Sequence, residues 1–362
     1  MIGRYRALRR AGLLGINERN LRLVNELNPR KLIRLVDDKR ETKRLAIAAG
    51  IPTPELYGVI ANPFHMRHLE SYLDKPDGVV IKPANGSQGN GIQVLMEPMR
   101  GGWRRSNGQR ALLEDIRFHV NNILSGMYSL SGQPDVAMFE YRVKFDEIFN
   151  PISFGGVPDI RIIVVRGIPA VAMVRLPTAE SDGKANLHKG GVGVGLDLVS
   201  GKTLSGMQNG KTTDIHPDTA NPLRNFSVPH WDTMLEMAAK AYDVTGLGYL
   251  GADIVLDKTK GPLLLELNAR PGLAIQVANR MGIRPLLKAT LEADTEKPRQ
   301  FATAAASLRQ AWQEMPEITE ISNNIILEET EEGLNIMLVD QDGRSMFREG
   351  SKYPYETTRR LI

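Results

Sequence analysis

The pattern of apolar and polar positions divides the chain into short strands and longer amphipathic helices. Apolar runs of strand length predict strands at 56–60, 79–82, 92–95, 136–140, 158–176 (a hairpin), around 253, around 266, and in two segments at 324–328 and 334–339. Longer periodic runs predict helices at 17–27, 37–49, 62–73, 111–124, 231–245, 285–293 and 299–312. Stretches 100–110 and 176–222 are rich in glycine and polar residues, so we expect loops there, the second long enough to be functional or mobile.

The stretch Leu263–Leu273, LLLELNARPGL, carries the most chemical information. Side chains two residues apart on a strand share a face, so Glu266 and Asn268 are expected to point the same way. Asp253 lies in a second apolar strand, GADIVLD. Carboxylate and amide oxygens are the ligands that Mg²⁺ prefers, so these three residues predict one metal site across two adjacent strands. The alternative is that the strand simply ends in a turn.

A glycine-rich segment, VVIKPANGSQGNGIQV, begins at Val79. Glycines let backbone N–H groups approach phosphate oxygens, and Lys82 at the end of the strand would place an ammonium on a phosphate. No Gly-Lys-Ser/Thr follows, so this is not a Walker A loop, and an ordinary hairpin is the competing interpretation. A lysine in an apolar strand is hard to explain structurally, because lysine is rarely buried without a partner.

Further polar residues follow the later strands. An apolar strand ends at Glu140, and Glu147 comes seven residues later. The hairpin 158–176 carries an arginine on each strand, and a second glycine-rich polar stretch, 184–195, follows it. The arginine that follows the predicted metal ligands, Arg270, lies on a turn where a guanidinium can bind a substrate carboxylate with two hydrogen bonds.

In this order and spacing the segments resemble an ATP-grasp enzyme, of the ribosomal-protein-S6-modification type or α-L-glutamate ligase-like branch. The resemblance covers about residues 36–290 and includes DDKRETKRLAIAAGIPTP. It implies an α+β fold in which two α+β subdomains with mainly antiparallel sheets clamp ATP. We expect a basic helical N-terminal segment in place of the family's Rossmann-like domain, which leaves the acceptor substrate open. The expected divisions are 1–36, the N-terminal segment; 37–145, the small subdomain; 146–294, the large subdomain; and 295–362, a helix and strand extension.

The resemblance also assigns roles to single residues. It implies ATP and two Mg²⁺ ions, for which Mn²⁺ can substitute, on Asp253, Glu266 and Asn268. Contacts to nucleotide are implied for Lys39, Lys82, Ser87, Gln88, Gly89, Glu140, Tyr141, Val143 and Glu147, with the base read near Glu140–Val143 and the ribose by Glu147. Arg175 and Asn186 would face the γ-phosphate and the reacting carbonyl, Arg270 the substrate, and Arg161 either the site or a structural pair with Asp159.

Composition narrows the possibilities further. The chain has 362 residues and no cysteine, which excludes disulfides and thiolate chemistry, and no apolar run long enough to span a membrane. Residues 1–44 contain 13 Lys/Arg against five Asp/Glu, but no aromatic platform accompanies them, so we expect no nucleic-acid partner. The predicted protein is a cytoplasmic carboxylate–amine ligase that acts on amino acids or peptides, glutamate being the specific guess; its oligomeric state is open. A small-molecule kinase and a non-catalytic nucleotide-binding protein are the alternatives.

Overall fold

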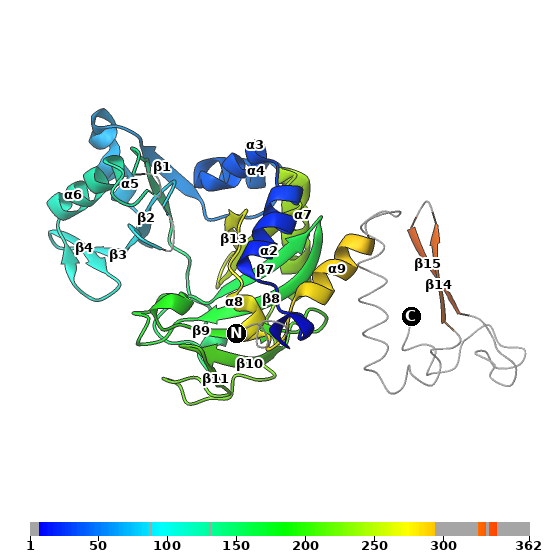
Figure 1. The fold of residues 1–362 in the computed structure, drawn as a ribbon. Coiled ribbons are helices and arrows are strands. Elements are labelled where there is room, and N and C mark those ends of the chain that lie inside the picture. Colours follow the sequence, from blue (N-terminus) through cyan, green and yellow to red (C-terminus); the bar gives the residue numbers. More distant parts are fainter. Residues whose placement is uncertain (1–6, 87–88, 130–131, 294–324, 331–332, 339–362) are drawn as a thin grey trace, which may run out of the picture. The chain divides into compact units, whose positions relative to one another are not determined.

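The structure, a computed structural model, describes residues 7–86, 89–129, 132–293, 325–330 and 333–338. The chain divides into two compact units, residues 1–287 and 288–362. The first unit contains two antiparallel sheets and most of the helices (Figure 1). In the second unit, β14 (Ile325–Thr330) pairs antiparallel with β15 (Gly333–Leu338), and both strands lie where the sequence predicts strands. The predicted helix at 299–312 lies outside the described residues.

The smaller sheet has the strand order β1–β6–β2–β3–β4–β5, and each neighbouring pair is antiparallel. Its strands are β1 (Leu56–Ile60), β2 (Val79–Pro83), β3 (Gln93–Met99), β4 (Gly102–Arg105), β5 (Arg110–Ala111) and β6 (Ala137–Tyr141). The helices η2 (Pro63–His68), α5 (Leu69–Leu73) and α6 (Leu113–Leu124) each pack one apolar face against it. The loop predicted at 100–110 is wrong, because Trp103 of β4 packs against this core and donates to the carbonyl of Leu73.

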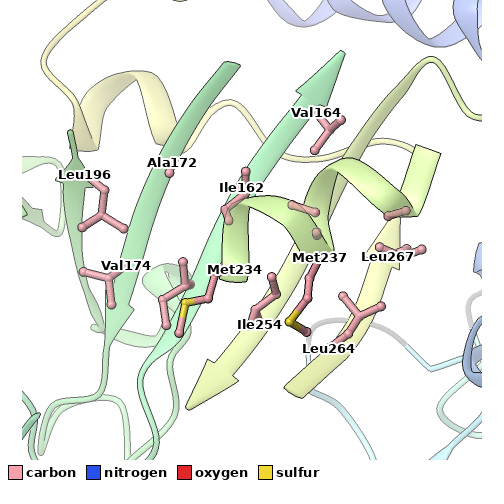
Figure 2. Packing of buried hydrophobic residues seen from close by; sticks show 14 of the residues in the cluster. Ile162, Val164, Ala172, Val174, Leu196, Met234, Met237, Ile254, Leu264 and Leu267 are labelled. Atoms are coloured by element: carbon pink, nitrogen blue, oxygen red, sulfur yellow. The ribbon is translucent and has the colours of Figure 1, made fainter. Parts of the chain in front are cut away.

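The larger sheet has the order β11–β10–β9–β8–β7–β12–β13, again antiparallel throughout. Its strands are β7 (Asp159–Val165), β8 (Ile168–Leu176), β9 (Val192–Leu196), β10 (Thr203–Gln208), β11 (Lys211–Thr213), β12 (Tyr249–Asp257) and β13 (Gly261–Asn268). Helix α7 (Trp231–Thr245) covers one face, where Met234 and Met237 pack among Ile162, Ile254 and Leu264 (Figure 2).

Strands β9 to β11 lie inside the stretch 176–222 that the sequence predicts as a loop. Glycines disguise β9, which reads VGVGL, but all five of its residues are buried. A Cβ on Gly195 would lie 2.6 Å from Asn279 Oδ1, at the end of α8 (Ala274–Ala278). Gly195 is therefore required because the end of α8 packs directly on the strand, and the strand assignment corrects the prediction.

The described chain begins with helical residues at 7–10, and four further helical segments follow: α2 (Ile16–Glu18), the π-helix η1 (Arg19–Asn25), α3 (Arg30–Asp37) and α4 (Lys39–Ala48). Asp38 caps α4 by accepting from the Arg40 N–H. The remaining helices are η3 (Glu147–Phe149), η4 (Leu187–Lys189) and α9 (Arg284–Ala293). Within the described residues, no helix is both long enough and apolar enough to cross a membrane.

Candidate functional site

A β-bulge in β13 decides which side chains face the site. Asp253 of β12 lies opposite Glu266, but its neighbour Ile254 lies opposite Leu264, so Leu265 is an extra residue on β13. Such bulges re-aim side chains and are frequent beside active sites. Leu264 and Leu267 pack in the core under α7, which leaves Glu266 on the face opposite to that core.

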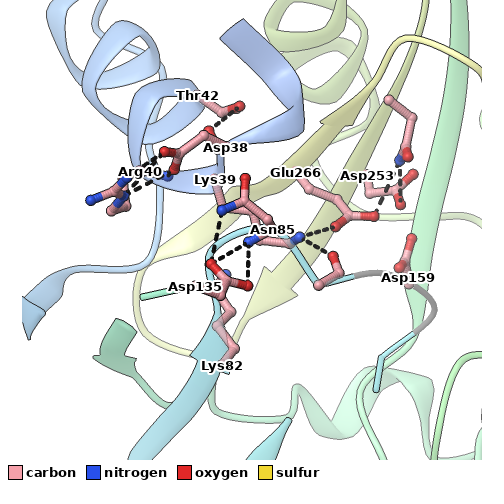
Figure 3. A network of polar contacts seen from close by, with 12 residues as sticks. Asp38, Lys39, Arg40, Thr42, Lys82, Asn85, Asp135, Asp159, Asp253 and Glu266 are labelled. Carbon is pink, nitrogen blue, oxygen red and sulfur yellow. Dashed lines mark hydrogen bonds and ion pairs between the residues drawn. The ribbon is translucent and has the colours of Figure 1, made fainter. Parts of the chain in front are cut away.

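Asn268, the last residue of β13, lies beside both carboxylates. Its Nδ2 lies 3.2 Å from Glu266 Oε1 and 3.4 Å from Asp253 Oδ2. The predicted proximity of Asp253, Glu266 and Asn268 is thus present in the structure, and Figure 3 shows the two carboxylates on neighbouring strands.

Asp253 is almost fully buried and is bound by two arginines. Arg161 donates from Nε (2.7 Å) and Nη2 (2.5 Å) to its two oxygens, and Arg175 Nη2 donates to Oδ2 at 2.8 Å. Burial alone would raise the pKa of Asp253, but the two guanidinium groups outweigh it and hold that pKa at about 2. Arg161 and Arg175 thus meet at one carboxylate from adjacent strands, β7 and β8.

Asp159 also belongs to this site, although its sequence context pointed to it only through the alternative of a structural pair with Arg161. The structure pairs it with Arg175 instead, its cross-strand neighbour in the β7–β8 register. Burial raises the pKa of Asp159 to about 6, although Arg175 opposes the shift. Its Oδ1 is buried and has no hydrogen-bond partner within the described residues. The strand register was the signal that could have identified it. We call Asp159, Arg161, Arg175 and Asp253 the acid–arginine cluster.

The donor set at β12 and β13 fits a hard divalent cation. Within the described residues, Glu266 forms no ion pair with an arginine; its charged neighbour is Lys39, with Nζ 3.8 Å from Oε2. Rotating the Asn268 amide by half a turn would present its oxygen beside Glu266. Asp253 fits less directly, because both its oxygens already accept from arginines. No cluster of three or more His, Cys, Asp or Glu side chains suited to a metal occurs in the described part.

Two lysines, Lys82 of β2 and Lys43 of α4, pair with the buried carboxylate of Glu140 on β6, and Lys39 of α4 lies near them. Lys82 Nζ lies 2.9 Å from Glu140 Oε2, and Lys43 Nζ lies 3.4 Å from Oε1. Burial lowers the pKa of Lys43 to about 8 and also lowers the pKa of Lys39. Lys43 was quoted in the family segment but was given no role. We call Lys39, Lys43, Lys82 and Glu140 the lysine cluster.

The glycine-rich loop is fastened to this region where it begins, at Asn85 and Gly86. Asp135 accepts from the Asn85 backbone N–H (3.0 Å) and from Asn85 Nδ2 (2.8 Å), a role the sequence analysis missed. Lys39 Nζ donates to the Gly86 carbonyl at 2.5 Å (Figure 3). Gly89 has φ +72° and open space around its Cβ position. The predicted phosphate contacts Ser87 and Gln88 lie outside the described residues.

The residues predicted to hold the nucleoside lie where β6 ends. Tyr141 packs with Val255 and Leu263, and Val143 lies against the same apolar group. Glu147 is 69% exposed and its Oε1 lies 2.5 Å from Lys258 Nζ. That ion pair lowers the pKa of Glu147. The roles of these residues stay predictions.

Two of the predicted substrate residues have other contacts in this structure. Arg270 is about half exposed and its Nη1 lies 3.6 Å from Asp37 Oδ1. Asn186 caps η4, since its Oδ1 accepts from the His188 N–H at 2.9 Å. Next to η4 is a cavity of about 310 Å³, lined by residues that include Leu187, His188, Met207, Asn209 and Ala274. Its volume is at the lower end of the range for small-molecule sites.

A family model described as sugar-transfer associated ATP-grasp matches residues 18–292. The chain belongs to this ATP-grasp family. The predicted superfamily and α+β fold class are thereby confirmed, and the two antiparallel sheets agree with them. The description "sugar-transfer associated" was not anticipated from the sequence.

Curated relatives of this ATP-grasp protein support the similarity to α-L-glutamate ligases. A "Probable alpha-L-glutamate ligase" of Xanthomonas oryzae pv. oryzae (strain MAFF 311018) is 28% identical over 247 residues, which are 68% of this chain and 61% of the relative. One from Sodalis glossinidius is 24% identical over 268 residues, 74% of this chain and 68% of the relative. The chain thus spans about three-fifths of the length of the first of these relatives.

Solved structures similar to this ATP-grasp protein include the D-cycloserine synthetase DcsG, at 16% identity and a TM-score of 0.43, covering 74% of this chain and 73% of that one. Another is the ATP-grasp ligase PsnB complexed with minimal precursor, Mg and ADP, at 14% identity and a TM-score of 0.39, covering 73% of this chain and 60% of that one.

Proposed function

We propose that this ATP-grasp protein is an ATP-dependent carboxylate–amine ligase. One observation carries the proposal: Lys39 contacts both the Gly86 carbonyl of the glycine-rich loop and Glu266 of the predicted metal site. A single side chain of the lysine cluster therefore joins the glycine-rich loop, which we call the basic wall, to the strands that carry Asp253 and Glu266, which we call the acidic wall. A polyphosphate with a bound cation needs both kinds of wall next to each other. The curated relatives named as probable ligases support the same activity.

The proposed reaction has two steps. The γ-phosphoryl group passes from ATP to a substrate carboxylate, giving an acylphosphate and ADP, and an amine then attacks the acyl carbon and expels phosphate. Bound Mg²⁺, two ions in our proposal, would neutralise charge on the phosphate oxygens. Lys39, Lys43 and Lys82 would orient the phosphates, while Arg175 would stabilise negative charge that develops on the transferred group. Arg161 would hold Asp253 in place.

The cavity beside η4 is our candidate site for part of the second substrate. Its apolar wall includes Leu187, Met207 and Ala274, and its polar groups come from His188 and Asn209. Among the described residues, no Asp, Glu, Lys or Arg lines it. We therefore expect it to bind an uncharged group, while the half-exposed Arg270 binds a carboxylate. Met207→Trp would fill the cavity and raise the KM for the amine substrate, whereas Met99→Trp, at an exposed site on β3, would leave it unchanged.

Product analysis tests the proposal. The purified protein is incubated with ATP, Mg²⁺ and pairs of amino acids, short peptides and amino sugars, the last because of the family's description. Release of ADP and phosphate together with an amide detected by mass spectrometry is the expected result. A stable phosphoester and ADP without free phosphate would identify a small-molecule kinase instead. Nucleotide binding without turnover on any pair would favour a non-catalytic module.

A further inference from the structure

The turn that follows the predicted metal ligands is held from the N-terminal segment. Arg19 Nη1 donates to the carbonyls of Arg270 (3.1 Å) and Pro271 (2.8 Å). Asn28 Nδ2 donates to the carbonyl of Ala269 at 2.9 Å. Three successive carbonyl groups, directly after Asn268, therefore accept hydrogen bonds from side chains about 240–250 positions earlier in the sequence.

These contacts are costly to arrange. Arg19 is only 8% exposed, and within the described residues it forms no ion pair. A buried guanidinium without a carboxylate is disfavoured unless its hydrogen bonds are satisfied, which here depends on the turn and on Asn20. Arg19 also begins the π-helix η1. Such π-helical turns are rare in proteins overall, and those that occur are often found at functional sites.

The turn at residues 269–271 also packs on β12, the strand that carries Asp253. Asn268 lies opposite Gly251 in the β12–β13 register, and a Cβ on Gly251 would lie 2.9 Å from Pro271 Cβ. Pro271 therefore rests on β12 two residues before Asp253. Asn28 also grips β12 itself, since its Nδ2 donates to the Tyr249 carbonyl at 2.7 Å and its Oδ1 accepts from the Tyr249 N–H at 2.9 Å.

We propose that Arg19 and Asn28 are positioning residues of the metal site, which fix Asn268 and its turn relative to Asp253. The inference rests on the metal–nucleotide site proposed above. Docking of the N-terminal segment has other anchors, because Gln276 exchanges two hydrogen bonds with the Leu14 backbone and Arg284 pairs with Glu18. The contacts of Arg19 are thus not needed simply to attach the segment.

Calorimetric titration of Mg²⁺ into the full chain at a fixed, saturating concentration of ATP tests the proposal, beside titration of ATP in the presence of EDTA. Groups that orient metal ligands typically change metal affinity by about 10- to 100-fold when they are removed. Arg19→Met is expected to weaken Mg²⁺ binding by about that factor while metal-free ATP binding changes less than about two-fold. Arg19→Lys keeps a donor and is expected to restore part of the loss.

The matched control is Arg284→Met, which removes the other arginine that links the N-terminal segment to the core. It should lower the melting temperature without changing Mg²⁺ affinity. Equal losses of Mg²⁺ affinity in both variants, or none in Arg19→Met, would overturn the proposal. If Arg19→Met does not fold, Arg19→Lys decides by the same comparison. Absence of Mg²⁺-dependent nucleotide binding in the wild type would overturn the proposed function as well, whereas a normal wild type with an unaffected Arg19→Met overturns the positioning role alone.

Discussion

The lysine cluster and the acid–arginine cluster both bury charge, but they balance it in opposite ways. In the lysine cluster, Lys43 and Lys82 share Glu140 and Lys39 adds a third positive charge near them, while the nearby Asp135 accepts hydrogen bonds from Asn85. On the larger sheet, two arginines face Asp159 and Asp253, and Glu266 beside them adds a further negative charge. The lysine cluster is left with excess positive charge, and we call it the positive wall. The acid–arginine cluster together with Glu266 is left with excess negative charge, and we call it the negative wall.

The comparison teaches where a ligand's charge is expected to go. Excess lysine suits phosphate oxygens, and excess carboxylate suits a cation that those same phosphates share. The pKa shifts agree with this division. Burial lowers the pKa of Lys43 to about 8 in the lysine cluster, because cations there are crowded and desolvated. In the other cluster burial raises the pKa of Asp159 to about 6, and the neighbouring Asp253 carboxylate adds to that rise although Arg175 opposes it. The predictions below test each wall in turn.

The largest effect is expected at the negative wall. Glu266→Gln keeps the shape of the side chain and removes its negative charge. Within the described residues, this carboxylate forms no ion pair with an arginine. We expect turnover to fall by about a thousand-fold or more, as is common when charge stabilisation is removed from a reacting phosphoryl group. Initial rates of ADP release at constant Mg²⁺ measure it.

The control for Glu266→Gln is Glu236→Gln, which removes an exposed carboxylate on α7. Near-wild-type activity of Glu266→Gln under these conditions would remove Glu266 from the metal site.

The positive wall is tested by Lys82→Met, which keeps most of the apolar stem and deletes the ammonium. ATP affinity is expected to fall by about 1.5–3 kcal/mol, the range for a hydrogen bond to a charged group. The variant also leaves Glu140 with Lys43 as its remaining lysine partner, so the melting temperature should fall too. Adding Glu140→Gln should restore much of the stability but not the nucleotide affinity. Unchanged ATP binding in calorimetry, with altered stability alone, would make Lys82 a structural lysine.

How far the sequence predicted this site depends on how local each signal is. Strand β1 and helix α7 were predicted at their observed bounds, because their apolar pattern and flanking breakers are contiguous in the chain. The proximity of Asp253 to Glu266 was also predictable, since two neighbouring strands carry them. The bulge at Leu265 was not, because LLLELN shows no feature that fixes its register.

Long-range pairing limited the rest. A pair between Asp159 and Arg161 was one of two interpretations because they are two residues apart, yet the sheet register pairs Asp159 with Arg175. Strand β9 was predicted as a loop because it is rich in glycine. Gly195 is needed there because α8 packs closely on the strand, and such a tertiary contact leaves no local signal in the sequence. Asp135 was missed because its role depends on a loop 50 positions earlier.

Protein stability measured as a function of pH tests the lysine cluster in the absence of any ligand. The pKa of Lys43 is lowered from 10.5 to about 8 in the folded protein, so between these values the unfolded chain binds more protons than the folded one. Stability contributed through this residue therefore rises as pH increases from about 8 to about 10.5, by up to about 3 kcal/mol. Denaturant unfolding of wild type and Lys43→Met across this range measures the difference. Parallel curves would show that Lys43 titrates normally.

The smallest effect is expected at Arg270, which lies at the edge of the negative wall. Its side chain is 53% exposed and faces Asp37 at 3.6 Å, so solvent weakens any interaction it makes. Arg270→Lys keeps the charge but loses the planar fork that binds a carboxylate with two hydrogen bonds. We expect a rise of about five-fold in the KM for the carboxylate substrate, corresponding to about 1 kcal/mol, with kcat and ATP affinity nearly unchanged. Asp37→Asn, which frees Arg270 from its present partner, should lower that KM or leave it unchanged. If ATP affinity falls instead while the KM of the acid stays constant, Arg270 contacts phosphate. The negative wall would then extend less far than proposed, and the carboxylate substrate would have to be bound elsewhere.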